Sequence, residues 1–397
     1  MLVSMLLLSL SACGPAGGGN GGNGGNNGPG GSDWAVYLEP EKAGSDDPRL
    51  NVDEVVAASG GGVYLAGRFQ GSLDGKQAEE DKTFLQKRTP GGGTAWTKVF
   101  DKRFRGMFLR DGGLGVVIDN DKTVRLFDTN GEQTATKSLP IEHVSEVLPR
   151  SDGGMYVASG SHLAKLDAAG SVVWKTEYCD YNCSSVREVA ASKDGSIYVV
   201  HRREHASSTD TTVTRLDASG NKSWSDAIDS SPLTEVGGLF VRQGKAYVVG
   251  SSSRVKENDN NGGDDLFFIE YGGASKAKST SLFGTKNAEH VGGVVDNGDG
   301  TVDVAYAVEQ LPEGDPEKSW WEWRWGTFTL AGDKESITHI GNRVKHPTRV
   351  HASAPFSIHD VVRASNNETY AVGWGTKRLF DEEAGEEEDA EFLKRLE

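Results

Sequence analysis

A unit of short apolar segments recurs along most of this chain, and its copies carry the same turn residues. Two copies are nearly complete, over residues 152–174 and 194–224, and each contains Asp-Gly-x-x-Tyr, then Leu-Asp-Ala-x-Gly, then Trp. A repeat of roughly 40 to 60 residues built only from short strands is the sequence signature of a β-propeller. We therefore predict an all-β fold, a β-propeller made of four-stranded antiparallel blades.

The number of blades follows from the apolar segment expected to form the second strand of each repeat. Seven such segments occur, at Val63–Ala66, Leu114–Val117, Met155–Ala158, Ile197–Val200, Ala246–Val249, Val302–Ala305 and Thr369–Val372. Candidate inner strands precede them, for example Glu54–Ala58, Glu188–Ala191 and Asp360–Arg363. The sequence therefore predicts a seven-bladed propeller.

The seventh repeat has no segment for its outer strand before the chain ends. The segment Trp34–Leu38 precedes the first inner strand and is similar to the outer-strand segment Trp96–Phe100. Pairing an N-terminal strand into the last blade would close the ring and hide an open sheet edge. We predict that Trp34–Leu38 pairs beside Phe392–Leu396.

The first 32 residues differ from the repeats in composition. Met1–Leu10 is apolar but too short to span a bilayer. The motif Leu10-Ser-Ala-Cys13 resembles the lipobox of bacterial lipoproteins, which implies a signal peptide over residues 1–12 and lipidation of Cys13. Residues 13–32 are then a Gly/Asn-rich flexible tether, and residues 33–397 are the propeller domain.

The residue after the lipobox cysteine indicates which of the two bacterial membranes carries the protein. Gly14 stands where the family carries Asp in lipoproteins retained at the inner membrane. The resemblance thus implies a lipid-anchored protein of the bacterial cell envelope, at the outer rather than the inner membrane.

The repeats themselves also resemble a known family. Phe-Leu-x-Lys at Phe84–Lys87, the Leu-Asp-Ala-x-Gly turns and the Trp that follows are similar to SBBP-type and PQQ-like propeller repeats of exported bacterial proteins. The resemblance covers nearly all of residues 33–397. It implies the fold and not a specific activity.

Charge narrows the classes of partner. The formal net charge of −16 excludes a nucleic-acid binder, because phosphate binding needs clustered Lys and Arg, and it disfavours contact with anionic lipid except through the anchor. We expect a monomer whose partner is an envelope protein, a peptide or a glycan.

Cys179 and Cys183 are the only cysteines besides Cys13. In an exported protein, a close pair in a loop favours a disulfide. A tetrahedral metal site has little support, because there is no third cysteine at this pair and no histidine beside it in the sequence.

Five segments between the second and third strands are long and are expected to be loops on one face of the ring. They are Arg68–Lys82, His201–Thr211, Ser251–Asp265, Glu309–Trp320 and Gly373–Asp389. The last contains the acidic run Asp381, Glu382, Glu383, Glu386, Glu387 and Glu388. Such a run is typical of a solvated loop, and the alternative is a docking surface for a cation or a basic partner.

Calcium is the only cofactor for which a spacing is present. Glu257, Asp259 and Asn261 alternate as in calcium loops but lack the closing Glu of an EF-hand. Asp296-Asn-Gly-Asp299 has a similar spacing and is interpreted as a turn between strands. We predict no other cofactor.

Two further motifs have alternative interpretations. His201-Arg-Arg-Glu-His205 matches a zinc-protease string, but that chemistry needs a helix and this segment continues a strand, so we interpret the match as chance. Trp320 and Trp321 begin a Trp-rich strand, which indicates packing between blades. The alternative is a stacking platform for a sugar or peptide.

The interpretation favoured by these features is a membrane-anchored binding or scaffolding module that acts through one acidic, loop-rich face, without catalysis. The alternative is a propeller enzyme of quinoprotein or lyase type. The resemblance to PQQ-like repeats implies adjacent cysteines in such quinoproteins, whereas three residues separate Cys179 from Cys183.

Overall fold

The structure is a computed structural model, and it describes a defined part of the chain. The described residues are 35–38, 48–110, 112–118, 122–141, 143–179, 183–204, 209–229, 234–252, 263–274, 276, 278–310, 320–332, 334–339, 344–345, 357–364, 367–376 and 389–396. The compact unit Ser32–Glu397 contains all of them.

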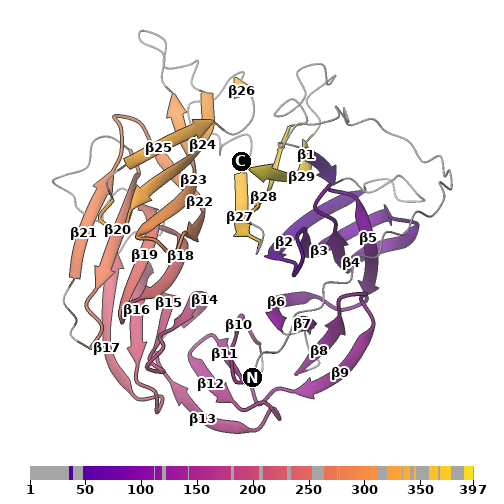
Figure 1. Cartoon of the computed structure of the whole chain (residues 1–397), viewed down its shortest axis with the longest axis horizontal. Helices are drawn as coiled ribbons and strands as arrows, with labels where there is room; N and C mark the ends of the chain where they lie inside the picture. The colour runs from indigo at the N-terminus through magenta and orange to yellow at the C-terminus, as the bar shows by residue number, and fades with distance from the viewer. Residues whose placement is uncertain are drawn as a thin grey trace, which may run out of the picture. The chain divides into compact units, whose positions relative to one another are not determined.

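The described strands form seven antiparallel sheets arranged around a common centre (Figure 1). The innermost strands are β2 (Arg49–Ala57), β6 (Phe104–Arg110), β10 (Glu146–Pro149), β14 (Cys183–Ala191), β18 (Glu235–Arg242), β22 (Glu289–Asp296) and β27 (Ser357–Arg363). The second strands are β3 (Val63–Leu73), β7 (Gly113–Ile118), β11 (Met155–Ser159), β15 (Ile197–Glu204), β19 (Lys245–Ser252), β23 (Thr301–Gln310) and β28 (Thr369–Thr376). The seven-bladed β-propeller predicted from the repeats is confirmed.

The outer half of each blade completes the up-and-down order. The third strands are β4 (Lys76–Arg88), β8 (Thr123–Asp128), β12 (His162–Leu166), β16 (Thr209–Leu216), β20 (Asp265–Tyr271), β24 (Trp320–Thr329) and β29 (Asp389–Leu396). The outer strands are β5 (Thr94–Phe100), β9 (Gln133–Ser138), β13 (Val172–Glu177), β17 (Lys222–Asp229), β21 (Lys278–Phe283), β25 (Lys334–His339) and β1 (Ala35–Leu38). A two-residue strand, β26 (Val344–Lys345), also pairs with β24.

The ring is closed by the N-terminal strand, as predicted. β1 pairs antiparallel with β29 in a register that aligns Ala35 with Lys394 and Leu38 with Glu391. Leu38 is 3% exposed and belongs to a core cluster that also holds Val55 of the first blade and Val372 of the seventh. The two ends of the propeller therefore share one sheet and one core.

The repeated hairpin joins neighbouring blades, as the turn between the third and outer strands of the fourth blade illustrates. In the turn Asp217–Asn221, the Asp217 carboxylate accepts the Asn221 backbone N–H at 2.9 Å, and Gly220 has a positive φ of 85°. Trp174 of the preceding blade donates its indole N–H to the Ala218 carbonyl at 3.1 Å. A Cβ on Gly220 would come within 2.8 Å of the Trp174 ring, so this glycine supplies both the turn conformation and the space for the tryptophan.

Two of the predicted long loops are wrong. In the segment His201–Thr211, residues 201–204 belong to β15 and residues 209–211 to β16, and the two strands pair from His201↔Thr212 to Glu204↔Thr209. The segment Arg68–Lys82 is a continuation of β3 and β4, which meet at the turn residues Asp74 and Gly75 with φ values of 48° and 72°. Phe69, at 0% exposed, packs in the core shared by the first and seventh blades. Burial of alternating apolar side chains therefore extends this hairpin into sheet.

Candidate functional site

The inner strands carry a recurrent irregularity that brings together one position from every blade. In six of the seven described inner strands the register with the second strand shifts by one residue, and the seventh, β10, starts at the equivalent place. The residues at this level are Glu54, Gly106, Glu146, Glu188, Gly238, Gly293 and Asp360. Four blades thus supply a carboxylate and three supply a glycine. We call Glu54, Glu146, Glu188 and Asp360 the carboxylate ring.

The four carboxylates affect each other's ionisation. Burial raises the pKa of Glu188 well above its ordinary value, and the charges of Glu146 and Asp360 raise it further. Glu54 shows the same direction, again through burial first and then through Glu146 and Asp360. These mutual effects indicate that the carboxylates lie near one another, and the inner strands that carry them surround the centre of the propeller in Figure 1.

The other two members of the carboxylate ring titrate close to neutral pH. Burial, followed by repulsion from Asp360, raises the pKa of Glu146 from 4.5 to about 7. Burial raises the pKa of Asp360 to about 6, although backbone N–H groups of Val55 and Val361 oppose this rise. The ring is therefore partly protonated at neutral pH, and a cation placed beside it would favour its ionised form.

Two members of the carboxylate ring bind the neighbouring blade. Asp360 accepts the Val55 N–H at 3.3 Å, which connects the seventh blade to the first. Glu54 accepts the Met107 N–H at 3.1 Å, which connects the first blade to the second. A Cβ on Gly106 would lie 3.9 Å from the Glu54 carboxylate, an ordinary contact distance, so the hydrogen bond does not depend on this glycine. Both carboxylates therefore have a structural role.

Glu146 and Glu188 are less constrained. The hydrogen bond of Glu146 is to the N–H of Val147 on its own strand. Within the described residues, Glu188 receives no hydrogen bond, and the positive charge acting on it is that of the adjacent Arg187. The effect of Arg187 on the pKa of Glu188 is smaller than those of burial, Glu146 and Asp360. Glu188 is therefore the group best placed to gain from a cationic ligand.

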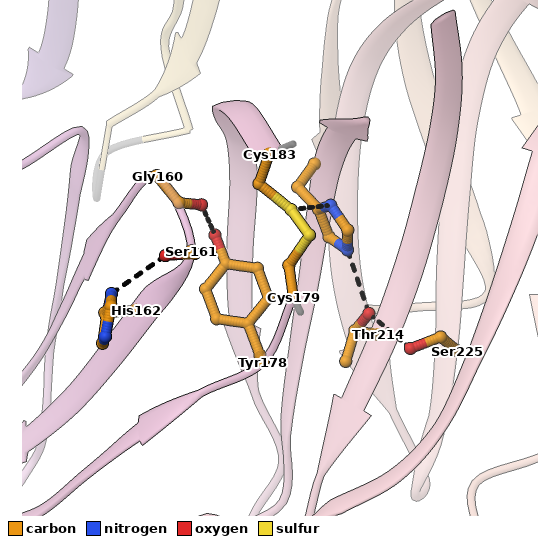
Figure 2. Close-up of a disulfide and its surroundings, with 9 residues drawn as sticks. Gly160, Ser161, His162, Tyr178, Cys179, Cys183, Thr214 and Ser225 are labelled. Carbon is orange, nitrogen blue, oxygen red and sulfur yellow. Dashed lines mark hydrogen bonds between the residues drawn. A yellow bond between two sulfur atoms is a disulfide. The ribbon is translucent and has the colours of Figure 1, made fainter. Parts of the chain in front are cut away.

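A second polar cluster lies where the third blade connects to the fourth (Figure 2). The structure joins Cys179, after β13, to Cys183, the first residue of β14, by a disulfide with Cα atoms 6.3 Å apart. Tyr178 is 1% exposed, and its hydroxyl donates to the Gly160 carbonyl. Its ring centroid lies 5.2 Å from that of His201, so the tyrosine forms one wall of the cluster.

His201 stands between the disulfide and the fourth blade. Its Nδ1 is 3.5 Å from Cys183 Sγ, and its Nε2 is 3.0 Å from Thr214 Oγ1, which in turn lies 2.8 Å from Ser225 Oγ. Burial lowers the pKa of His201 to about 4, so the imidazole is neutral at neutral pH. No histidine lies beside the cysteine pair in the sequence, but the pairing of β14 with β15 brings His201 to it.

The zinc-protease string does not have the geometry of that chemistry. His201 and Glu204 both lie on the strand β15, whereas the motif needs its histidines on one helical face. His205 lies outside the described residues.

The Trp-rich segment forms strand β24. Trp323 and Trp325 are 4% and 8% exposed and pack in a core shared with the seventh blade. The backbones of Trp320 and Trp321 pair with Lys345 and Val344. Whether these two form a stacking platform stays a prediction, because their side chains lie outside the described set.

Several other predicted site residues also lie outside the described residues. These are Cys13, the calcium candidates Glu257, Asp259 and Asn261, and the acidic run Asp381, Glu382, Glu383, Glu386, Glu387 and Glu388. The interpretation of residues 296–299 as a turn agrees with the structure. Asp299 there accepts the Thr301 N–H at 2.9 Å, between β22 and β23.

Comparisons with known proteins support the fold alone. No family model and no curated protein matches the chain. The WD40 domain of Pan2 from Neurospora crassa is 8% identical with a TM-score of 0.53, over 91% of this chain and 95% of that chain. U3-55K is 11% identical with a TM-score of 0.54, over 93% of this chain and 100% of that chain.

A bacterial structure also aligns, with a lower score. The extracellular domain of a one-component system from B. thetaiotaomicron is 10% identical with a TM-score of 0.49, over 90% of this chain and 39% of that chain. The described part of the present chain contains no helix with the length and apolar character that a membrane span needs. The chain is similar in fold to the WD40 domain of Pan2 and to U3-55K.

Proposed function

We propose that this chain is a binding module of the bacterial cell envelope whose ligand presents a positively charged group to the carboxylate ring. One observation carries the proposal: Glu188 is partly buried among three other carboxylates, and no described side chain or N–H group donates a hydrogen bond to it. An uncompensated carboxylate in such a place costs free energy, and a bound cation recovers that cost. Perturbed ionisable groups of this kind concentrate at functional sites.

The chemistry of the ligand follows from the spacing of the carboxylates. Among the described residues, only one group brings three His, Cys, Asp or Glu ligand atoms within 4.8 Å of one another, and it is not in the carboxylate ring. No three carboxylates of the ring thus come together as the ligands of one metal ion. An ammonium or guanidinium group fits better, because each can donate several hydrogen bonds at the end of a flexible chain. Such a group is carried by a polyamine or by a Lys or Arg of a partner protein.

The cellular setting of the proposal comes from the sequence. The lipobox-like Cys13 and the Gly/Asn-rich segment after it support a lipid-anchored module, at the outer rather than the inner membrane. A binding role without catalysis is proposed because the sequence contains no recognised nucleophile motif. The acidic run 381–389 is proposed to attract the same cationic partners by long-range electrostatics.

The test is equilibrium binding of two cationic probes, spermidine and a short Lys-rich peptide, by calorimetry. The double variant Glu146→Gln, Glu188→Gln is expected to weaken binding of the recognised probe at least tenfold. Its matched control is Glu132→Gln, Glu177→Gln, which makes the same two substitutions at exposed positions and is expected to change binding less than twofold.

The two probes distinguish a free amine from an amine that belongs to a protein partner. Tighter binding of spermidine indicates a small ligand, and tighter binding of the peptide indicates a partner protein. Equal weakening by the two double variants would show that only net charge matters and would contradict the proposal.

A further inference from the structure

We infer that Cys179, Cys183 and His201 form a redox-gated site for a thiophilic divalent cation, with Zn²⁺ as the ion it fits. In this inference the disulfide is the oxidised, closed state of the site, and the two thiols are its metal-binding state. The site shares no residue with the carboxylate ring, and the inference does not rest on the proposed function.

The positions of the ligand atoms carry the inference. The two sulfurs and a ring nitrogen of His201 all lie within 4.8 Å of one another, and this is the one such group of three or more ligands among the described residues. Two thiolates and one imidazole are a common ligand set of tetrahedral zinc, with Zn–S near about 2.3 Å and Zn–N near about 2.1 Å. Two such thiolates would stand roughly 3.7 Å apart, which a turn of their side chains from the disulfide provides.

The surroundings hold the histidine as a ligand. Thr214, which is 0% exposed, contacts Nε2 of His201 at 3.0 Å, and Ser225 contacts Thr214 in turn. This leaves Nδ1 directed at Cys183, 3.5 Å away. A hydrogen bond from the outer nitrogen is the usual device that fixes the tautomer and orientation of a metal-bound histidine.

The exposure of the cluster and the number of its ligands are also consistent with an exchangeable metal site. His201 and Cys179 are 1% and 4% exposed, whereas Cys183 is partly exposed, so an ion or a reductant can reach the cluster on the Cys183 side. With three protein ligands, a tetrahedral ion keeps its fourth position for water or a small anion. The site is thus of the exchangeable rather than the fully enclosed kind.

The redox step balances with a thiol reductant. Two thiols of the reductant give two electrons and two protons to the Cys179–Cys183 bond, which yields two protein thiols and one disulfide of the reductant. Binding of Zn²⁺ then displaces the two thiol protons. In the reverse direction, a disulfide oxidant takes two electrons from the two thiolates, the protein disulfide forms again, and the ion leaves.

The test is an anaerobic titration of the full chain with Co²⁺, an optical substitute for Zn²⁺, followed by displacement with Zn²⁺. The reduced chain is expected to bind one Co²⁺ with a thiolate-to-metal charge-transfer band, and the oxidised chain is expected to show no such band. This comparison needs no substitution, so misfolding of a variant cannot explain it. Failure of the reduced chain to bind Co²⁺ would overturn the inference.

Variants then assign the ligands. Cys179→Ser is expected to remove most of the charge-transfer intensity, and His201→Gln is expected to weaken Co²⁺ binding about 100-fold. Thr214→Val, which removes only the positioning contact, is expected to weaken it about tenfold. His162→Gln changes a nearby histidine outside the cluster and is the matched control. Equal affinity of His201→Gln and His162→Gln would show that His201 is no ligand.

Discussion

At the scale of single residues, the ionisation of the carboxylate ring makes stability depend on pH. A carboxyl whose pKa is raised by folding binds its proton more tightly in the native state than in the unfolded chain. Its contribution to stability is complete below its unfolded pKa and is lost as the pH rises through the folded value. For Glu146 this interval runs from 4.5 to about 7. Glu146 therefore makes the folded propeller less stable at alkaline pH than at acidic pH.

Substitution of Glu146 by Gln tests this directly. Gln cannot ionise, so the variant is expected to gain about 1 to 2 kcal/mol of stability relative to the native chain between pH 5 and pH 8.5, after allowance for partial exposure of Glu146. Denaturant unfolding at the two pH values measures the difference. Glu177→Gln, an exposed residue of the same blade, is expected to change by less than about 0.5 kcal/mol at either pH. A pH-independent effect of Glu146→Gln would contradict the raised pKa.

The residues of both sites were visible in the sequence, but their roles were not. Glu54, Glu188 and Asp360 begin the segments from which inner strands were predicted. Only the pairing register shows that they occupy one level of the ring, because a strand pattern fixes the alternation of faces but not the alignment between blades. His201 lies 18 residues from Cys183, and the pairing of β14 with β15 is what brings them together.

At the scale of secondary-structure elements, the glycines of the inner strands set how closely blades approach. A Cβ on Gly293 would lie 2.9 Å from Cγ2 and 3.0 Å from the backbone N of Val361, on the inner strand of the next blade. The equivalent Gly106 has open space, with only the Glu54 carboxylate at 3.9 Å. Equivalent positions of the repeat thus have different reasons for being glycine.

The pair Gly293→Ala and Gly106→Ala separates these reasons. Gly293→Ala is expected to destabilise the chain by about 1 to 3 kcal/mol, because the backbone of β27 cannot move away without disturbing the packing of the neighbouring blades. Gly106→Ala is expected to change stability by less than about 1 kcal/mol. Urea unfolding of the two variants measures both effects. Equal losses would show that the spacing of β22 and β27 is not set by Gly293.

The turn motif was predictable at this scale because its chemistry is local. Asp at the start of the turn and Gly in a positive-φ position are needed wherever the hairpin occurs. The hydrogen bond from Trp174 to the next blade was not predictable, because nothing in one repeat shows how far the neighbouring blade is rotated. The extended hairpin of β3 and β4 was missed because its polar alternate residues resemble those of a loop.

At the scale of the whole molecule, closure by β1 unites the first and last segments of the ring. Leu38→Ala is expected to destabilise the chain by about 2 to 4 kcal/mol, because it leaves a cavity in the core between the first and seventh blades. Val173→Ala, on another outer strand where Val173 is 55% exposed, is expected to cost less than about 0.5 kcal/mol. Thermal unfolding of both variants measures the difference. Similar melting temperatures for the two variants would contradict closure through β1.

The architecture could be derived from sequence because repeats report it several times over. Seven copies of one apolar segment fix the blade count, and the missing last strand predicts where the first one pairs. The candidate site has no such redundancy, because it arises from differences between the copies at one position, carboxylate in four and glycine in three. The residue at this one inner-strand position, which differs between blades, is therefore the feature that indicates a functional site.

The most direct test of the proposed function is the number of protons released when the cationic probe binds at pH 7. Calorimetry in buffers with different ionisation enthalpies gives this number. A cation beside Glu146, Glu188 and their partners lowers raised pKa values, so the account predicts net proton release, which disappears in Glu146→Gln, Glu188→Gln. Binding without proton release would place the cation on carboxylates that are already ionised, outside the ring, and would contradict the account.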